Sequence, residues 1–91
     1  MINKDTKFKI SSDIAISEIN HESVLLDLST GTYFQVNELG SFIISELKDY
    51  KSMYELQKKI IHSFNVSDKA CNDDLEGFIK NLLEKNLLLI K

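Results

Sequence analysis

The segment SVLLDLSTGTYFQVN, residues 23–37, predicts a β-hairpin that continues directly into a helix. Apolar side chains recur at every second position of its first half, which is the period of a half-buried strand. The tripeptide Ser29-Thr30-Gly31 then has the composition of a tight turn, with Gly31 in the left-handed conformation. The return strand is expected at Thr32–Val36. The hairpin therefore predicts a sheet in the first half of the chain.

Two further segments extend the predicted β structure toward the N-terminus. Ile14–Ile19 is a run rich in isoleucine, and a short polar turn separates it from a strand at residues 23–28. Phe8 and Ile10 alternate with lysines ahead of it. Residues 14–36 are therefore expected to form a three-stranded antiparallel meander. A sheet of so few strands has at least one candidate open edge, which is a place to bind an extended peptide.

The remainder of the chain has helical periodicity. Asn37, Ser52 and Ser67 are good N-caps, and Ser52 opens a capping box with the pattern S-x-x-E. Asn86 fits a left-handed position after the last helix, and the apolar tail at residues 87–90 is expected to pack on the core. The apolar positions of the three predicted helices are Leu39, Phe42, Ile43 and Leu47; Met53, Leu56, Ile60 and Phe64; and Cys71, Leu75, Phe78, Ile79 and Leu82.

This order of elements predicts an α+β protein in which a three-stranded antiparallel sheet is followed by three helices. Three short helices with tight turns beside a hairpin resemble a winged helix-turn-helix. The 91 residues suffice for a single domain, residues 1–91, and the polar residues 1–6 are expected to be disordered.

Composition limits the function. The net charge is −3 and all 11 basic residues are lysine, so the arginine forks that bind phosphate and guanine are absent. An acidic chain of this kind is a poor nucleic-acid binder, because that affinity is mostly phosphate neutralisation. The single cysteine, Cys71, excludes an intramolecular disulfide and favours a reducing compartment. No run approaches the ~20 apolar residues of a membrane span, so we expect a cytoplasmic protein without membrane contact.

The residue types that perform catalysis or bind metals are few and poorly spaced. His21, His62 and Cys71 show no pattern of metal ligands, so no metal site is expected. The neighbouring carboxylates of Asp73 and Asp74 would point about 100° apart on a helix, so they do not converge for acid–base work. Ser29-Thr30-Gly31 is too short for a phosphate loop. The sequence therefore predicts a protein that is not an enzyme and has no cofactor.

A helical projection of the third predicted helix separates three faces. Its apolar residues cover one contiguous arc, and its charged residues cover the opposite side. Between them, next to Phe78, runs a lane of small or polar residues: Ala70, Asp74, Gly77 and Asn81. A glycine within a helix costs about 1 kcal/mol relative to alanine. Gly77 either is tolerated, or allows close packing of another element, or lets a bound chain approach the helix, with Asp74 available for a cationic side chain.

At this point the motifs resemble those of PqqD-like proteins, the pyrroloquinoline-quinone biosynthesis D family. The segment VLLDLSTGTYFQVN is similar to their hairpin "VLLDL…G.Y..LN", and Asn37-Glu38-Leu39-Gly40 to the "LN..G" entry of their first helix. Residues 74–82, DLEGFIKNL, resemble their third helix, "DV..FL..L". The resemblance covers roughly residues 14–90. Its departures from the family pattern are Val36 for Leu, Asn86 for Gly, the polar Gln35 and Gly77.

The resemblance implies the fold and the function of a RiPP recognition element of the stand-alone, lasso-peptide type. Such a domain is a winged helix-turn-helix that binds the leader of a ribosomally made precursor peptide as an added strand and presents it to a leader peptidase or other maturation enzyme. The leader side chains would enter the groove between the third strand and the third helix. The residues implied in leader binding are Thr32, Tyr33, Phe34, Gln35 and Val36 from the strand, and Asp74, Leu75, Phe78, Ile79 and Leu82 from the helix.

Several alternatives remain at this stage. Alternation puts Tyr33 and Phe34 on opposite faces of the strand, and either one can face the groove. The fold class also allows a winged-helix DNA-binding regulator, although charge disfavours it, and a small enzyme is the third possibility. The exposed edge of the third strand is a surface through which two copies can form a homodimer.

Overall fold

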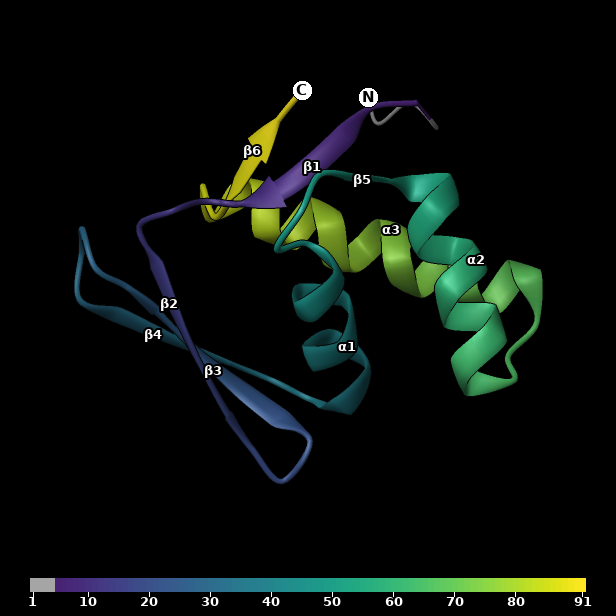
Figure 1. The fold of residues 1–91 in the computed structure, drawn as a ribbon, viewed down its shortest axis with the longest axis horizontal. Coiled ribbons are helices and arrows are strands. Elements are labelled where there is room, and N and C mark those ends of the chain that lie inside the picture. Colours follow the sequence, from purple (N-terminus) through teal and green to yellow (C-terminus); the bar gives the residue numbers. More distant parts are fainter. Residues whose placement is uncertain (1–4) are drawn as a thin grey trace.

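The computed structural model describes residues 5–91, and these form two small antiparallel sheets and three helices (Figure 1). One sheet has the order β5-β1-β6 and contains β1 (Lys7–Ile10), β5 (Lys51–Ser52) and β6 (Leu88–Ile90). The other has the order β2-β3-β4 and contains β2 (Ile14–Ile19), β3 (Glu22–Asp27) and β4 (Thr32–Val36). The helices are α1 (Glu38–Glu46), α2 (Met53–Phe64) and α3 (Asp68–Glu84). The predicted α+β class and its three helices are confirmed.

Of the stretch expected to be disordered, residues 1–4 lie outside the described residues. The prediction of a single sheet is incomplete, because β1 near the start of the chain pairs with β6 at its end. Phe8 lies opposite Ile90, and Ile10 lies opposite Leu88. The apolar tail packs on the core through Leu87, which is fully buried, but it continues as a strand whose Ile90 is 60% exposed. A three-residue apolar run has no readable period, and its partner strand lies at the other end of the sequence, so pattern alone does not reveal this sheet.

The predicted meander is present as β2, β3 and β4. The two residues between β2 and β3, Asn20 and His21, have φ angles of 52° and 68°. Positive φ at both positions is the requirement of a type I′ hairpin turn. Gly31, before β4, has a φ of 76° and takes the predicted left-handed conformation. The register places Leu25 of β3 opposite Phe34 of β4, so these two side chains share one face of the sheet.

The turn between β3 and β4 is organised by Asp27. The Asp27 carbonyl oxygen accepts a hydrogen bond from the Gly31 amide at 2.7 Å. The carboxylate accepts from the Ser29 hydroxyl at 2.7 Å and from the Ser29 amide at 3.0 Å. The Ser29 hydroxyl is the largest cause that lowers the pKa of Asp27 below its ordinary 3.8. The ionised carboxylate thus stabilises the turn that positions β4.

This arrangement predicts a pH dependence of stability. A carboxyl group whose pKa is lowered by folding stabilises the fold above its unfolded pKa, and loses that contribution as the pH falls through its folded pKa. Because the pKa of Asp27 lies below 3.8 in the folded chain, the contribution is complete at neutral pH and is lost in strong acid. We expect thermal melts to show that Asp27→Ala destabilises the protein at pH 7 and by much less near pH 2. An equal effect at both pH values would contradict this role.

Each helix begins at the cap predicted for it. The Asn37 side chain accepts a hydrogen bond from the Gly40 amide at 2.9 Å. Ser52 forms the predicted capping box with Glu55, and the Ser67 hydroxyl accepts from the Ala70 amide at 3.2 Å. Asn37 is also the one residue between β4 and α1. The start of α1 is therefore held directly at the end of β4, with no flexible loop between them.

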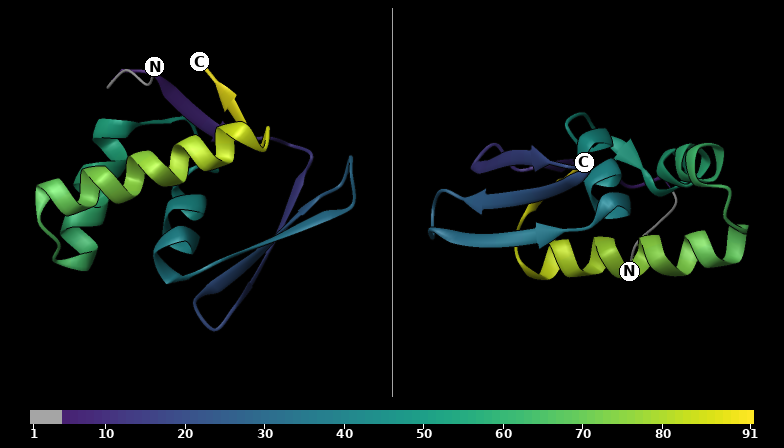
Figure 2. Two further views of the ribbon diagram at one scale, coloured as in Figure 1. Left: turned by 180° about the vertical axis from the view of Figure 1, so that it is seen from behind. Right: turned by 90° about the horizontal axis from the view of Figure 1, so that it is seen from below.

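The core lies between the helices and the inner faces of both sheets. The buried hydroxyl groups of Ser23 in β3 and Ser41 in α1 are hydrogen-bonded to each other, which fixes this helix on the sheet. Figure 2 shows β4 as the strand of its sheet nearest to α3, running beside the C-terminal half of that helix. The buried apolar residues are Phe8, Ile10, Ile14, Leu25, Ile43, Ile44, Leu47, Leu56, Ile60, Cys71, Leu75, Ile79, Leu82 and Leu87.

Candidate functional site

Strand β4 is an edge strand. Within the described residues it pairs with β3 alone, in the order β2-β3-β4. In an antiparallel pair, every second residue of an edge strand points its N–H and C=O groups away from its neighbour. These groups are free to pair with another extended chain. The strand is short and leads into α1 at Asn37, so any added chain is brought to the surface of the helices.

A pocket of about 130 Å³ lies between β4 and α3. Lys85, the C-cap residue of α3, places its Nζ atom 5.7 Å from the centroid of the Phe34 ring. The Lys85 side chain therefore covers an apolar surface that a bound chain would otherwise contact. The residues that line the pocket are Leu25, Phe34, Gln35, Val36, Phe78, Asn81, Leu82, Lys85 and Leu87.

A wider pocket of about 480 Å³ continues along α3 toward the start of α1. Phe78 and Asn81 line both pockets, so the two are contiguous, and we call them together the α3 groove. The residues that line the wider pocket are Asn37, Leu39, Gly40, Ile43, Asp73, Asp74, Gly77, Phe78 and Asn81. The groove thus extends from Lys85 at one end to Asp73 at the other.

The strand residues implied in binding divide between two faces. Phe34 and Val36 line the groove and pack against the core. Gln35 also borders the groove, but it is exposed and its side-chain amide donates a hydrogen bond to Glu22 at 3.3 Å. Tyr33 is 70% exposed and does not line the groove. Of the two residues, Phe34 is therefore the one whose side chain faces the groove. Thr32 is exposed at the hairpin end of the strand, and its backbone pairs with Asp27.

The implied helix residues also divide. Asp74 and Phe78 line the groove. Leu75 and Ile79 are 1% and 0% exposed and face the core, so they support the groove from behind and offer no surface to a ligand. Leu82 is almost as buried, although it contributes to the end of the groove near Lys85. The apolar arc of α3 is wider than the groove, because most of it packs inside the protein.

Other residues of the groove carry a weaker signal in the sequence. Gly77 and Asn81 belong to the lane of small or polar residues beside Phe78, and both line the wider pocket. Leu39 and Gly40 come from the start of α1, where helical periodicity assigns Leu39 to the core and the sequence indicates no binding role for either residue. Lys85 follows the last turn of α3, and no pattern in the sequence places it over Phe34.

Charge is unevenly distributed around the groove. The stretch from residue 10 to residue 47, which forms the second sheet and α1, contains no lysine or arginine. Its carboxylates are Asp13, Glu18, Glu22, Asp27, Glu38 and Glu46. Within the groove, Asp73 and Asp74 lie in the wider pocket and Lys85 lies in the smaller one. The groove is therefore negative at one end and positive at the other.

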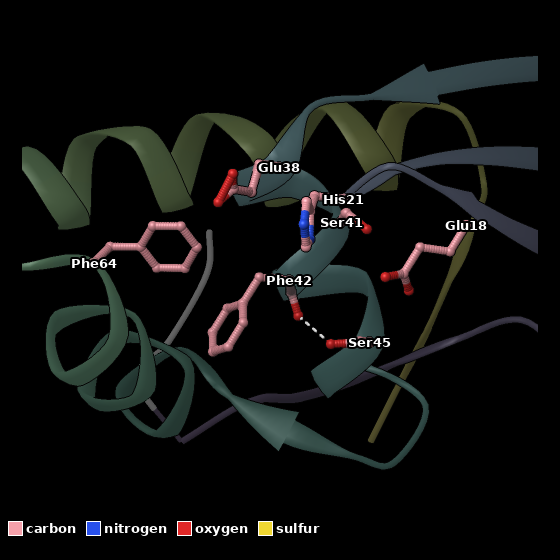
Figure 3. Close-up of a pocket in the computed structure, with 7 residues that line it drawn as sticks. All are labelled: Glu18, His21, Glu38, Ser41, Phe42, Ser45 and Phe64. Carbon is pink, nitrogen blue, oxygen red and sulfur yellow. Dashed lines mark hydrogen bonds between the residues drawn. The ribbon is translucent and has the colours of Figure 1, made fainter.

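A separate hollow of about 220 Å³ lies on the other side of α1, as Figure 3 shows. His21, Glu18 and Glu38 border it, but none of the three forms a hydrogen bond with another residue of the hollow. The Ser45 hydroxyl donates to the Phe42 carbonyl at 2.7 Å, and the Ser41 hydroxyl is engaged with Ser23. No nucleophile in this hollow is activated by a neighbouring base.

Two further features bear on chemistry. Cys71 is buried, and desolvation, followed by the charges of Asp68 and Asp74, raises the pKa of its thiol, which keeps it protonated and unreactive. Among residues 5–91, no three His, Cys, Asp or Glu side chains gather closely enough to hold a metal ion. In the same part of the chain, none of the helices has the length and apolar character needed to cross a membrane.

The family model described as Coenzyme PQQ synthesis protein D (PqqD) matches residues 22–88. TbiB1, solved in complex with the TbiA(beta) leader peptide, is 38% identical to the chain, and its structure matches with a TM-score of 0.81. The match covers 88% of this chain and 93% of TbiB1. The chain belongs to the PqqD family, as its motifs predicted.

A second solved structure has the same fold. Lasso peptide synthetase B1, complexed with its leader peptide, has a TM-score of 0.77 at 23% identity, with 90% of this chain and 96% of that chain covered. No curated protein matches the sequence. PqqD-like proteins are non-catalytic, and the chain, as a member of this family, is not an enzyme.

Proposed function

We propose that the protein binds the leader segment of a ribosomally synthesised precursor peptide as an additional strand on β4. The observation that carries this proposal is the unpaired edge of β4 beside the α3 groove. TbiB1, which has a similar structure, was solved with a leader peptide. The backbone of the leader pairs with Thr32–Val36, and its alternate side chains enter the groove.

Each part of this site has a separate role. Backbone hydrogen bonds to β4 set the register of the peptide and contribute affinity without regard to its sequence. Contacts with Phe34, Val36 and Phe78 supply apolar burial and select side chains by shape. Leu75 and Ile79 hold α3 at a fixed distance from β4, because both are packed in the core.

We further propose that the bound leader is presented to a separate leader peptidase or other maturation enzyme. Holding the leader beside such an enzyme raises the local concentration of the attached core peptide, so that it reacts as if tethered. The winged helix-turn-helix arrangement is part of the same proposal, with the β3–β4 hairpin as the wing and residues 1–91 as one domain. A reducing cytoplasm suits the single buried thiol of Cys71.

The β4 edge has a second possible occupant, another copy of this chain. We propose that the leader and a second copy compete for the same edge, so that addition of leader dissociates any homodimer formed there. A DNA-binding role receives no support from the charge distribution, because the stretch 10–47 lacks basic residues.

Strand addition predicts a periodic response to backbone modification of the peptide. The probe is the fluorescein-labelled TbiA(beta) leader peptide, or a leader selected from a peptide library if that one does not bind. Methylation of successive backbone nitrogens is expected to weaken binding about ten-fold at every second position and to have little effect at the positions between. The unaffected positions serve as internal controls, and fluorescence polarisation measures each affinity.

Amide hydrogen exchange provides an independent measurement. Binding is expected to slow exchange within Thr32–Val36, because unpaired edge amides acquire hydrogen bonds. Exchange in α2, none of whose residues lines the groove, is expected to remain unchanged. Binding with neither the alternating pattern nor protection of β4 would rule out strand addition, and absence of binding to every tested leader would rule out the proposed function.

A further inference from the structure

Gly77 lines the wider pocket of the α3 groove. This residue is exposed in the middle of α3, and a Cβ atom built on it would meet no atom within 4 Å. Its lack of a side chain is therefore not required by packing inside the protein. Glycine is the least favourable residue here, apart from proline, for helix formation. The missing side chain of Gly77 leaves open space at the side of the groove.

The residues that line this pocket are of two kinds. Leu39 and Phe78 supply apolar surface, with the buried Ile43 behind them. Asp73, Asp74, Asn37 and Asn81 are polar. A side chain that fills such a pocket needs a long apolar stem and an end that satisfies carboxylates. Lysine and arginine have this form.

The charges of the residues that line the pocket favour a cation. Asp73 pairs with Lys69 at 3.3 Å, but both side chains are largely exposed, at 69% and 88%. Asp74 forms no ion pair within residues 5–91, and its nearest charged neighbours in sequence are acidic. Lys80 is paired with Glu76, whose side chain does not line the pocket. An acidic ligand side chain would be repelled here, and a purely apolar one would cover the carboxylates without pairing them.

We propose that the pocket beside Gly77 receives a lysine or arginine side chain of the bound peptide, with its stem on Phe78 and its charged end at Asp74. The inference rests on the proposed function and adds a specificity to it. Because Lys85 lies at the opposite end of the groove, the basic side chain also fixes the direction in which the peptide lies along α3. Gly77 is the specificity-determining residue, since any larger side chain would occupy the space of the stem.

The test begins with a display library of random peptides, selected on the full-length wild-type protein. We expect the selected peptides to share a lysine or arginine at one fixed position. That residue is then replaced by norleucine, which keeps the stem and removes the charge. The replacement is expected to weaken binding to the wild type about five-fold and binding to Asp74→Asn by less than about two-fold, as a double-mutant cycle measures.

Two variants sharpen the result. Glu76→Gln removes the same charge from the same helix but outside the pocket, and it is expected to respond to norleucine as the wild type does. Gly77→Leu is expected to bind the basic and the norleucine peptides equally weakly, because the pocket is filled. Circular dichroism establishes that each variant is folded.

The outcomes separate the two proposals. Selected peptides that bind on β4 without a common basic residue would overturn this inference and leave the proposed function standing. An equal effect of norleucine on the wild type and on Asp74→Asn would do the same. If the wild type selects no peptide at all, the proposed function fails, and this inference fails with it.

Discussion

Leu75→Asp is expected to unfold the protein. Leu75 is 1% exposed, so the new carboxylate would lie among the apolar side chains of the core. An uncompensated charge in a protein interior costs about 3–5 kcal/mol, and the loss of the buried leucine adds to this. A domain of this size has a stability near the low end of ~5–15 kcal/mol, so the sum is comparable to the whole. Loss of the helical circular dichroism signal and of the cooperative thermal transition would be the direct observation.

The neighbouring residue supplies the control. Asp74 lines the groove and is exposed, and Asp74→Asn is expected to melt within a few degrees of the wild type. The contrast between adjacent positions tests the assignment of one to the core and the other to the surface. A Leu75→Asp protein that melts cooperatively and still binds a leader would show that this side of α3 is not part of the core.

The same helix illustrates what a sequence can specify. A period of about 100° per residue indicates which face of α3 is apolar, and that prediction is confirmed at Cys71, Leu75 and Ile79. The period does not show how much of this face the other helices and the strands cover. Phe78 belongs to the same arc but is only partly buried beside Gly40 of α1, so it borders the groove. That boundary is set by how α1 packs on the sheet, which is a tertiary property.

Strand β4 and the sheet that contains β1 and β6 also show which features the sequence can predict and which it cannot. Alternation separates Phe34 from Tyr33 correctly, but the inward face is fixed only by pairing with β3, where Leu25 lies opposite Phe34. The turn, the caps and the hairpin were predictable because their signals are local. The pairing of β1 with β6 joins opposite ends of the chain, and neither strand has a sequence pattern from which its partner could be predicted. Lys85 is placed over Phe34 by this global arrangement as well.

The two helical glycines of the groove are expected to respond to alanine with opposite signs. A Cβ atom on Gly40 would lie 3.0 Å from Val36 Cβ and 3.1 Å from Phe78 Cε1, whereas one on Gly77 would meet nothing within 4 Å. Gly77→Ala is therefore expected to stabilise the protein by up to about 1 kcal/mol, which raises the melting temperature by several degrees. Gly40→Ala gains the same helix propensity, but overpacking of about 1–3 kcal/mol exceeds it and destabilises the protein.

Binding should distinguish the pair further. Val36 Cβ is attached directly to the β4 backbone and cannot move away from a new methyl group on residue 40. The Phe78 ring, which lines both pockets of the groove, must therefore move in the Gly40→Ala variant. Displacement of this ring changes the shape of both pockets, so leader affinity is expected to fall about ten-fold. Gly77→Ala instead combines a higher melting temperature with an affinity no better than that of the wild type, because its new methyl group enters the wider pocket. Thermal melts and polarisation titrations of both variants provide the measurement. Two alanine variants that shift stability in the same direction would show that the spacing between β4, α1 and α3 is not as tight as the contacts at Gly40 require.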